Sequence, residues 1–236
     1  MQNSEARPVG RPIELAKDLA ILNAARQLLF RDGPRAFTVE AVARAAGVSK
    51  VTVYARHGSR EALLQAVIGQ LAQELSMAFD QRPGDSTELR ASLTEFGRRL
   101  LAFTISSEHV GLMRSLLGSG ASSAPALRGV FRRGPAAMLQ RVSAWLAECH
   151  RDGALHCPLP ERSAETLLGM LQGLALVRAT YGAVNTGSRR DIEGHVSFAV
   201  DAFLRAHRVE PPRLPASTCV SSTGSGRAVS RRCRAR

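Results

Sequence analysis

Several features that would place this chain in a membrane or outside the cell are missing from its sequence. No apolar run approaches the roughly 20 residues that a membrane-spanning helix needs. The first twelve residues, MQNSEARPVGRP, lack the apolar core of a signal peptide. Four cysteines among 236 residues are too few for a disulfide framework. We therefore expect a soluble protein of the reducing cytoplasm that has no membrane partner.

The sequence also lacks a recognisable set of catalytic residues. It contains no glycine-rich phosphate-binding loop, no nucleophile motif and no paired carboxylates in a familiar context. Soft metal ligands gather once, where Cys149-His150 and His156-Cys157 flank a turn. Their spacing matches no standard zinc pattern, so we interpret this segment as an ordinary loop rather than a zinc site. These absences predict a protein that is not an enzyme and that holds no metal and no cofactor.

Positive charge is abundant but unevenly distributed. The chain has a formal net charge of +12 and a pI near 11.1, which favour a polyanionic partner. Residues 1–65 contribute +4 and residues 66–207 contribute +2, whereas residues 208–236 contribute +6. Because half of the excess lies in this last segment, the overall pI does not locate the surface that such a partner would bind.

The most informative segment is TVEAVARAAGVSKVTVYARHGSREALL, from Thr38 to Leu64. Its first part spaces apolar residues three and four positions apart, as the buried stripe of a helix does, at Val39, Val42, Ala43 and Ala46. Thr38 precedes this stripe, and its hydroxyl can cap free backbone N–H groups. Gly47 then allows a left-handed turn, and Ser49 caps a second helix that extends to about Arg56. The pattern predicts a helix-turn-helix.

The order of residues in this segment resembles that of the TetR family of bacterial transcriptional regulators. The matching positions are Thr38, Val42-Ala43, Ala46-Gly47-Val48-Ser49, Thr52-Val53-Tyr54 and Arg60. The alternative is an unrelated three-helix bundle with a tight glycine turn, but such a turn alone would not explain the full spaced string. The chain departs from the family pattern at Arg56-His57, where the family favours a tyrosine or histidine followed by phenylalanine. We interpret His57 as a structural histidine, which either hydrogen-bonds within the junction or leaves it looser and pH-sensitive.

The predicted second helix presents hydrogen-bond donors that suit phosphates and base edges. Lys50 is the expected base reader, because its ammonium can donate to guanine O6 and N7, and Val51 beside it can pack on a thymine methyl. Arg60 opens the next helix, where its positive charge interacts unfavourably with the helix macrodipole. A phosphate bound at this N-terminus would offset that cost, and the alternative is an arginine that only contacts solvent. The resemblance implies phosphate contacts at other matching positions. The complete predicted DNA-binding set is Thr38, Ser49, Lys50, Val51, Thr52, Tyr54, Arg56 and Arg60.

The pattern along the whole chain predicts an all-α fold of about nine helices, with an N-terminal three-helix DNA-binding bundle and a larger effector and dimerisation domain. We expect a flexible basic arm at 1–12, the helix-turn-helix domain at 13–58, the ligand-binding and dimerisation domain at 59–207 and a disordered arginine-rich tail at 208–236. Helices are expected at about 14–31, 39–46, 50–56, 60–82, 86–106, 108–117, 125–151, 162–184 and 189–207. The arm either reaches a minor groove or contacts nothing, and the tail either adds non-specific DNA attraction or is inert.

The larger domain offers candidates for an effector cavity and for a dimer interface. The string from Phe131 to Gly173 looks like the effector domain of AefR-like TetR regulators, which implies helical architecture but no particular effector. Bulky residues there line a cavity or form ordinary core, and the few charges among them favour an apolar or aromatic ligand. The cavity candidates are Phe96, Leu100, Phe103, Met113, Leu117, Met138, Trp145, Met170 and Tyr181. The resemblance implies a four-helix dimer interface, predicted at Leu167, Leu171, Leu174, Val196, Ala199 and Phe203, although in a monomer these residues would be core.

These features predict a homodimeric, sequence-specific transcriptional regulator. We expect a repressor that a small apolar or aromatic effector releases from a double-stranded DNA operator. The alternative is a sequence-tolerant architectural DNA-binding dimer without an effector, whose affinity would fall steeply with salt and hardly depend on sequence. A helical enzyme or carrier would leave Lys50, Tyr54 and Arg60 without a role.

Overall fold

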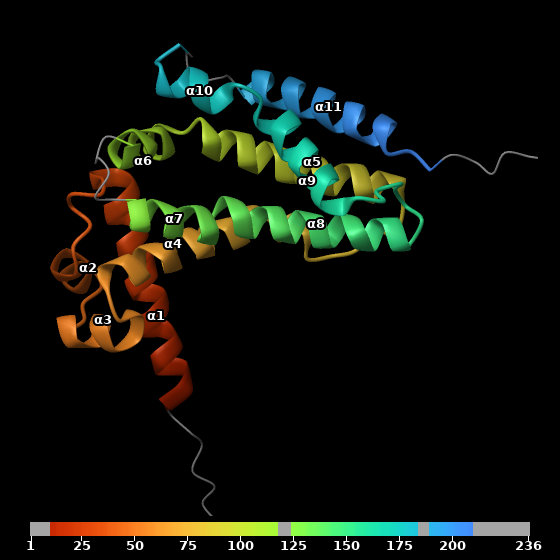
Figure 1. The fold of residues 1–236 in the computed structure, drawn as a ribbon. Helices are drawn as coiled ribbons and strands as arrows, with labels where there is room; N and C mark the ends of the chain where they lie inside the picture. Colours follow the sequence, from red (N-terminus) through yellow and green to blue (C-terminus); the bar gives the residue numbers. More distant parts are fainter. Residues whose placement is uncertain (1–9, 118–123, 184–188, 210–236) are drawn as a thin grey trace, which may run out of the picture.

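The structure is a computed structural model that describes residues 10–117, 124–183 and 189–209. These ranges contain eleven α-helices, one π-helical turn, one 3-10 turn and no strand, which confirms the predicted all-α class. The predicted arm and tail lie almost wholly outside the described residues. Figure 1 shows helices α1 to α3 gathered at one end of the molecule, with the long helices of the larger part extending away from them. None of the described helices combines the length and the apolar composition that crossing a bilayer requires.

Three helices form the N-terminal bundle, which we call the head: α1 (Gly10–Gln27), α2 (Val39–Ala45) and α3 (Lys50–His57). Both predicted caps are confirmed, because Thr38 Oγ1 accepts the Ala41 N–H at 3.1 Å and Ser49 Oγ accepts the Thr52 N–H at 3.1 Å. Gly47 between the helices has a φ of +66°, which glycine adopts without steric cost. The predicted first helix ends differently, since its last turn is the π-helix η1 (Leu28–Asp32).

Helix α4 (Arg60–Leu75) joins the head to the rest of the chain. Ser59 caps it, because its hydroxyl accepts the Ala62 N–H at 3.0 Å, but the helix is shorter than the expected 60–82. The Ser76 hydroxyl donates to the Ala72 carbonyl at 2.8 Å, and the chain then turns into the 3-10 helix η2 (Met77–Phe79). The first half of α4 packs into the core of the head, whereas Leu71, Ala72 and Leu75 pack into a second core. Thus α4 is one continuous helix shared by both cores.

The larger part contains seven further helices: α5 (Ser86–Thr104), α6 (Ser107–Leu117), α7 (Ala124–Arg133), α8 (Pro135–Arg151), α9 (Pro160–Gln172), α10 (Ala175–Thr180) and α11 (Arg189–Ala206). Two predicted helices are each broken in two, so the described residues hold eleven helices rather than nine. The expected 125–151 helix divides at Gly134, because Pro135 has no N–H with which to continue the ladder of α7. The expected 162–184 helix divides at Gly173, whose φ is +48°.

The second core lies where α5, α8, α9 and α11 meet. Helix α5 approaches α9 and α11 closely at Gly97, where an added Cβ would lie 2.6 Å from Leu171 Cδ2 and 2.8 Å from Val196 Cγ1. Arg90 of α5 also forms an ion pair with Asp201 of α11, so a charged contact joins the same two helices. In Figure 1, α11 and α9 lie on the opposite side of this part from α4.

Candidate functional site

The outer face of α3 carries most of the residues predicted to contact DNA. Val51 is 77% exposed and Tyr54 is also exposed, while Val53 packs into the core of the head. Lys50 Nζ lies 2.8 Å from Glu40 Oε1, and this hydrogen bond lowers the pKa of the Glu40 carboxyl. Beside them, the hydroxyls of Ser49 and Thr52 lie 2.9 Å apart. We call Ser49, Lys50, Val51, Thr52 and Tyr54 the α3 face.

Arg56 belongs to the predicted set but turns away from this face. Its Nη1 lies 2.7 Å from Asp18 Oδ1 and donates to the Glu14 carbonyl at 3.0 Å. Only 18% of its side chain is exposed. Arg56 therefore links α3 to α1, and a phosphate would have to compete with these acceptors.

Arg60 stands at the start of α4, as predicted, but its guanidinium is already occupied. It donates from Nε to the Phe37 carbonyl at 2.7 Å and from Nη2 to the Pro34 carbonyl at 2.8 Å, and it lies over the Phe37 ring. These contacts fasten the loop before α2 to α4. Neither sequence-based interpretation of Arg60 included them, because the partners lie more than twenty residues away along the chain.

His57 occupies the half-buried junction between α3 and α4. Its Nε2 is buried and has no hydrogen-bond partner among the described residues. Burial lowers the pKa of the imidazole, an effect that the Asp18 charge opposes and the Arg56 charge reinforces. The ring is therefore neutral at pH 7 and fills space that suits an apolar side chain.

A cavity of about 310 Å³, which we call the inner cavity, lies between α4, α5, α6 and the α7–α8 junction. Its wall is mainly apolar and is interrupted by Thr104, His109 and Gln172. His109 Nδ1 lies 3.0 Å from the Thr104 carbonyl, and the Thr104 hydroxyl donates to the Leu100 carbonyl at 2.8 Å. Burial lowers the pKa of His109, although its backbone hydrogen bond opposes the shift. The cavity could hold a small apolar or aromatic molecule with one or two polar groups.

Four of the nine residues predicted for an effector cavity line the inner cavity: Leu100, Phe103, Met113 and Met138. Phe96 and Trp145 are instead core residues, with ring centroids 4.6 and 4.7 Å from that of Phe79. Tyr181 is 84% exposed, and Met170 packs against the second core. The side chain of Leu117 lies outside the described residues. Bulk alone did not distinguish the side of a helix that faces a cavity from the side that faces the core.

The sequence prediction also missed residues of the cavity wall. Phe30 lies in η1, which was expected to be the plain end of the first helix. Gln172 and Thr104 carry no motif. His109 is the residue from which the cavity wall could have been predicted, because a single imidazole beside an apolar stripe indicates a buried polar group.

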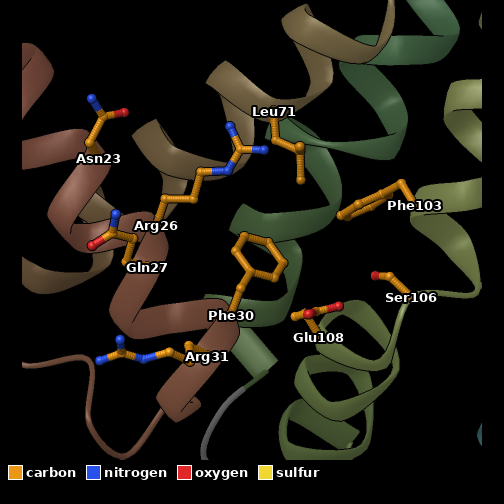
Figure 2. Close-up of a pocket in the computed structure, with 9 residues that line it drawn as sticks. All are labelled: Asn23, Arg26, Gln27, Phe30, Arg31, Leu71, Phe103, Ser106 and Glu108. Carbon is orange, nitrogen blue, oxygen red and sulfur yellow. The ribbon is translucent and has the colours of Figure 1, made fainter.

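A second, more open pocket of about 500 Å³ lies between the end of α1 and the start of α6 (Figure 2), and we call it the outer pocket. Its polar lining residues are Asn23, Arg26, Gln27, Arg31, Ser106 and Glu108. Phe30, Leu71 and Phe103 line both spaces. The rings of Phe30 and Phe103 meet edge to face with centroids 6.1 Å apart. These three side chains therefore form a shared wall between the inner cavity and the outer pocket.

Five of the six residues predicted for a dimer interface lie inside the chain's own core. Leu167, Leu171, Val196 and Phe203 have no exposed surface, and Ala199 is 3% exposed. In the single chain these five side chains form core, which is the alternative that the sequence left open, and they offer a second chain almost no surface. Leu174 is 61% exposed, and the other exposed large apolar residues of α10, α11 and the turn after α10 are Val177, Tyr181 and Phe198.

The turn between α8 and α9 brings the paired cysteines and histidines together without a metal-binding arrangement. Cys149 and Cys157 are buried free thiols, and burial raises the pKa of Cys149 to about 12. His150 Nδ1 accepts the Cys157 N–H at 3.3 Å. Among the described residues, no group of three or more possible ligands is placed to hold a metal ion.

Comparisons with known proteins agree with this architecture. Residues 21–67 match the profile of bacterial regulatory proteins of the tetR family, and residues 91–209 match the C-terminal domain of AefR-like transcriptional repressors. None of the curated proteins gives a significant sequence match.

Solved structures with the same fold include three regulators. A TetR-family regulator from Mesorhizobium loti is 23% identical, with a TM-score of 0.64 over 87% of this chain and 100% of that one. A TetR regulator from Agrobacterium tumefaciens is 25% identical, with a TM-score of 0.66 over 82% and 95%. The flavonoid-responsive regulator FrrA is 27% identical, with a TM-score of 0.60 over 85% and 99%.

The two profiles cover the parts of the chain that the geometry distinguishes. The first spans the helix-turn-helix with its exposed α3 face, and the second, residues 91–209, spans half of the chain and much of the wall of the inner cavity. The chain therefore belongs to the TetR family of bacterial transcriptional regulators.

Proposed function

We propose that this TetR-family regulator is a repressor that binds its operator as a homodimer and leaves it when a small apolar or aromatic effector enters the inner cavity. Residues 13–58 bind DNA, and residues 59–207 bind the effector and the second chain. The α3 face enters the major groove, with Lys50 and Val51 on base edges. The observation that carries this proposal is the position of α4, whose first half belongs to the core of the head and whose second half lines the inner cavity.

Release would follow from the way the walls of the inner cavity are shared with the head. Ile68 of α4, and Leu112 and Leu116 of α6, line the cavity and also belong to the core of the head. A ligand that moves α4 or α6 must therefore move the head or repack its core. Because the coupling is an equilibrium property, the effector weakens DNA binding by the same factor by which DNA weakens effector binding.

The proposed effector class rests on the wall of the inner cavity and on one similar protein. The wall is apolar apart from three side chains, so a molecule with many charges would lose more hydration than the cavity could replace. FrrA, which is 27% identical to this chain, is a flavonoid-responsive regulator. That property supports an aromatic effector with few polar groups.

The proposed dimer surface consists of the exposed apolar residues Leu174, Val177, Tyr181 and Phe198. A single α3 covers too few base pairs for useful specificity, and two heads on two half-sites resolve this. Phe198→Glu should give a monomer in sedimentation experiments and weaken operator binding. Met77→Glu, which changes an exposed apolar residue of η2, should leave the dimer intact. A dimeric Phe198→Glu variant would show that the second chain docks elsewhere.

The DNA-binding proposal is tested by selecting bound sequences from a random DNA pool with the full chain. Affinity for the selected operator and for single-base variants is then measured by fluorescence anisotropy. Lys50→Ala should lose about 1–3 kcal/mol of discrimination at one base pair of each half-site. Tyr54→Phe, which removes an exposed hydroxyl, should lower the affinity for all DNA sequences about equally. Arg151→Ala, at the last residue of α8, is the matched control, and Figure 1 shows that α8 extends away from the head.

The competing function is a sequence-tolerant architectural dimer. It would show equal affinity for the selected operator and for random DNA of the same length, with a steep dependence on salt. Under that result Lys50→Ala would reduce affinity for both DNAs alike, and the repressor proposal would fail. If the operator is specific, compounds are then screened for their ability to release the chain from it. Met138→Trp fills part of the inner cavity, so a compound that no longer releases this variant binds in the inner cavity.

A further inference from the structure

The outer pocket differs in chemistry from the inner cavity behind it. Hydrogen-bond donors line it on the α1 side, where Asn23 lies one turn before Arg26 and Gln27. Ser106 adds a hydroxyl from the α5–α6 connection, while Glu108 supplies an acceptor on the α6 side. A ligand group placed on the α1 side therefore meets donors, which favour an oxygen-rich or anionic group.

Arg26 is the central donor of this pocket. Its Nη1 donates to Glu74 Oε2 of α4 at 2.6 Å, and Gln70 holds the other Glu74 oxygen at 3.1 Å. Figure 2 shows Arg26 reaching from α1 toward α4 beside Leu71, whereas Arg31 points away from the aromatic pair. A guanidinium has five N–H donors, so Arg26 can donate to a ligand oxygen in addition to, or in place of, Glu74.

The wall between the two spaces is made of side chains that can move. Phe30 and Phe103 are each only half-buried, and they meet edge to face rather than interlocking. Phe30 lies in the π-helical turn η1, a rare backbone form that is frequent at functional sites. Rotation of these two rings would open the part of the wall that they form, beside Leu71, which stays buried in the second core.

We propose that the two spaces together bind one two-part effector, whose aromatic body lies in the inner cavity and whose anionic group is held by Arg26 in the outer pocket. The ligand class is an aromatic acid with one carboxylate or sulfonate group. Glu108 repels a second anion, so the charged group is confined to the α1 side. This inference rests on the proposed function, because it assumes that the inner cavity binds the effector.

The position of Arg26 gives the anionic group a direct route to the head. The Arg26–Glu74 ion pair links α1, which is part of the head, to α4. A ligand anion competes with Glu74 for the same guanidinium and so weakens this link. The effector then acts twice, by displacing the wall of the inner cavity and by loosening the contact between α1 and α4.

The test uses two fluorescent probes with the same aromatic body. 1-Anilinonaphthalene-8-sulfonate carries one anion, and N-phenyl-1-naphthylamine lacks it; both become bright in apolar surroundings. Each should bind the full chain at one site, and each should displace the other. Arg26→Gln should weaken the sulfonate probe about fivefold and change the neutral probe less than about twofold. Arg35→Gln, which removes one exposed charge outside both spaces, is the control for net charge.

Glu74→Gln gives a change of opposite sign that a purely structural role would not produce. It removes the competing carboxylate, so the sulfonate probe should bind more tightly while the neutral probe is unchanged. The inference is overturned if Arg26→Gln affects both probes equally, or if Glu74→Gln fails to tighten the sulfonate probe. DNA does not enter this experiment, so those results leave the proposed repressor standing. If the neutral probe fails to bind the unmodified chain, the proposal that the inner cavity binds the effector is itself refuted.

Discussion

The junction between α3 and α4 contains a buried nitrogen that can be replaced without changing the shape of the side chain much. His57 Nε2 has no hydrogen-bond partner among the described residues, and burial lowers the pKa of its ring. Phe is of similar shape and carries no polar atom. We therefore predict that His57→Phe stabilises the protein, because it removes a desolvated polar group and keeps the packing.

The size of the gain follows from the burial of the ring. A buried, unsatisfied polar group costs about 1–3 kcal/mol, and the lower end applies because His57 is only half-buried. A gain of about 1 kcal/mol corresponds to an increase in Tm of about 2–4 °C for a chain of this size. At neutral pH the imidazole is uncharged, so this figure refers to the cost of the neutral ring alone.

The stability difference between His57→Phe and the unmodified chain should increase as the pH is lowered. The pKa of His57 in the folded protein lies below its ordinary 6.5, so between the two values the unfolded chain binds a proton that the folded chain does not. The free energy of unfolding therefore falls as the pH drops from about 6.5 toward the folded pKa. The Phe variant lacks this loss. His109 has a pKa shifted in the same direction and is present in both proteins, so its effect cancels in the comparison.

Chemical denaturation at equal protein concentration, at about pH 7.5 and about pH 5.5, measures both effects. We expect a higher midpoint for His57→Phe with an unchanged slope, and a larger difference at the lower pH. His156→Phe makes the same change at an exposed histidine and should stay within about 0.5 kcal/mol of the unmodified chain. A His57→Phe variant that is no more stable, or whose gain is the same at both pH values, would refute the reasoning.

Three further predictions concern packing, the α3 face and a buried thiol. Gly97→Ala should cost about 1–3 kcal/mol in thermal or denaturant unfolding, because the added methyl meets Leu171, whereas Gly69→Ala in the open part of α4 should not destabilise. Glu40→Gln removes a carboxylate that competes with the DNA bases for the Lys50 ammonium, so operator affinity should rise, and an unchanged Kd in anisotropy would contradict this. Cys149, with a pKa of about 12, should resist alkylation by iodoacetamide in the folded chain at neutral pH but react fully in denaturant, as read by mass spectrometry.

The starts of α2, α3 and α4 were predictable because local chemistry sets them. Thr38, Ser49 and Ser59 each accept an N–H three residues ahead, and the bond depends only on residues within one turn. Gly47 was predictable for the same reason, since a left-handed turn needs no distant partner. The helix breaks at Gly134 and Gly173 also lie at glycines, but the apolar periodicity continues across both positions, so the sequence pattern predicted unbroken helices there.

The choice between core and interface could not be predicted in the same way. The period of an apolar stripe shows which side of a helix is buried, but it does not show what buries it. Leu171 and Val196 pack inside the chain, where the absent side chain of Gly97 makes room for them. Leu174, three residues after Leu171, falls beyond the break at Gly173 and is exposed. That distinction depends on contacts between helices that are far apart in the sequence.

The arginines around the head show why positive charge near a recognition helix does not by itself indicate DNA contact. Arg56 links α3 to α1, Arg60 links α4 to the loop before α2, and Arg26 links α1 to α4. A partly exposed ion pair such as Arg26–Glu74 contributes only about 0–1 kcal/mol, so this contact orients α1 and α4 more than it stabilises them. A weak link is also one that a ligand can exchange at little cost. Of the three, only Arg26 lines a pocket beside the inner cavity, so under the proposed mechanism it is the link through which the effector changes the orientation of the head.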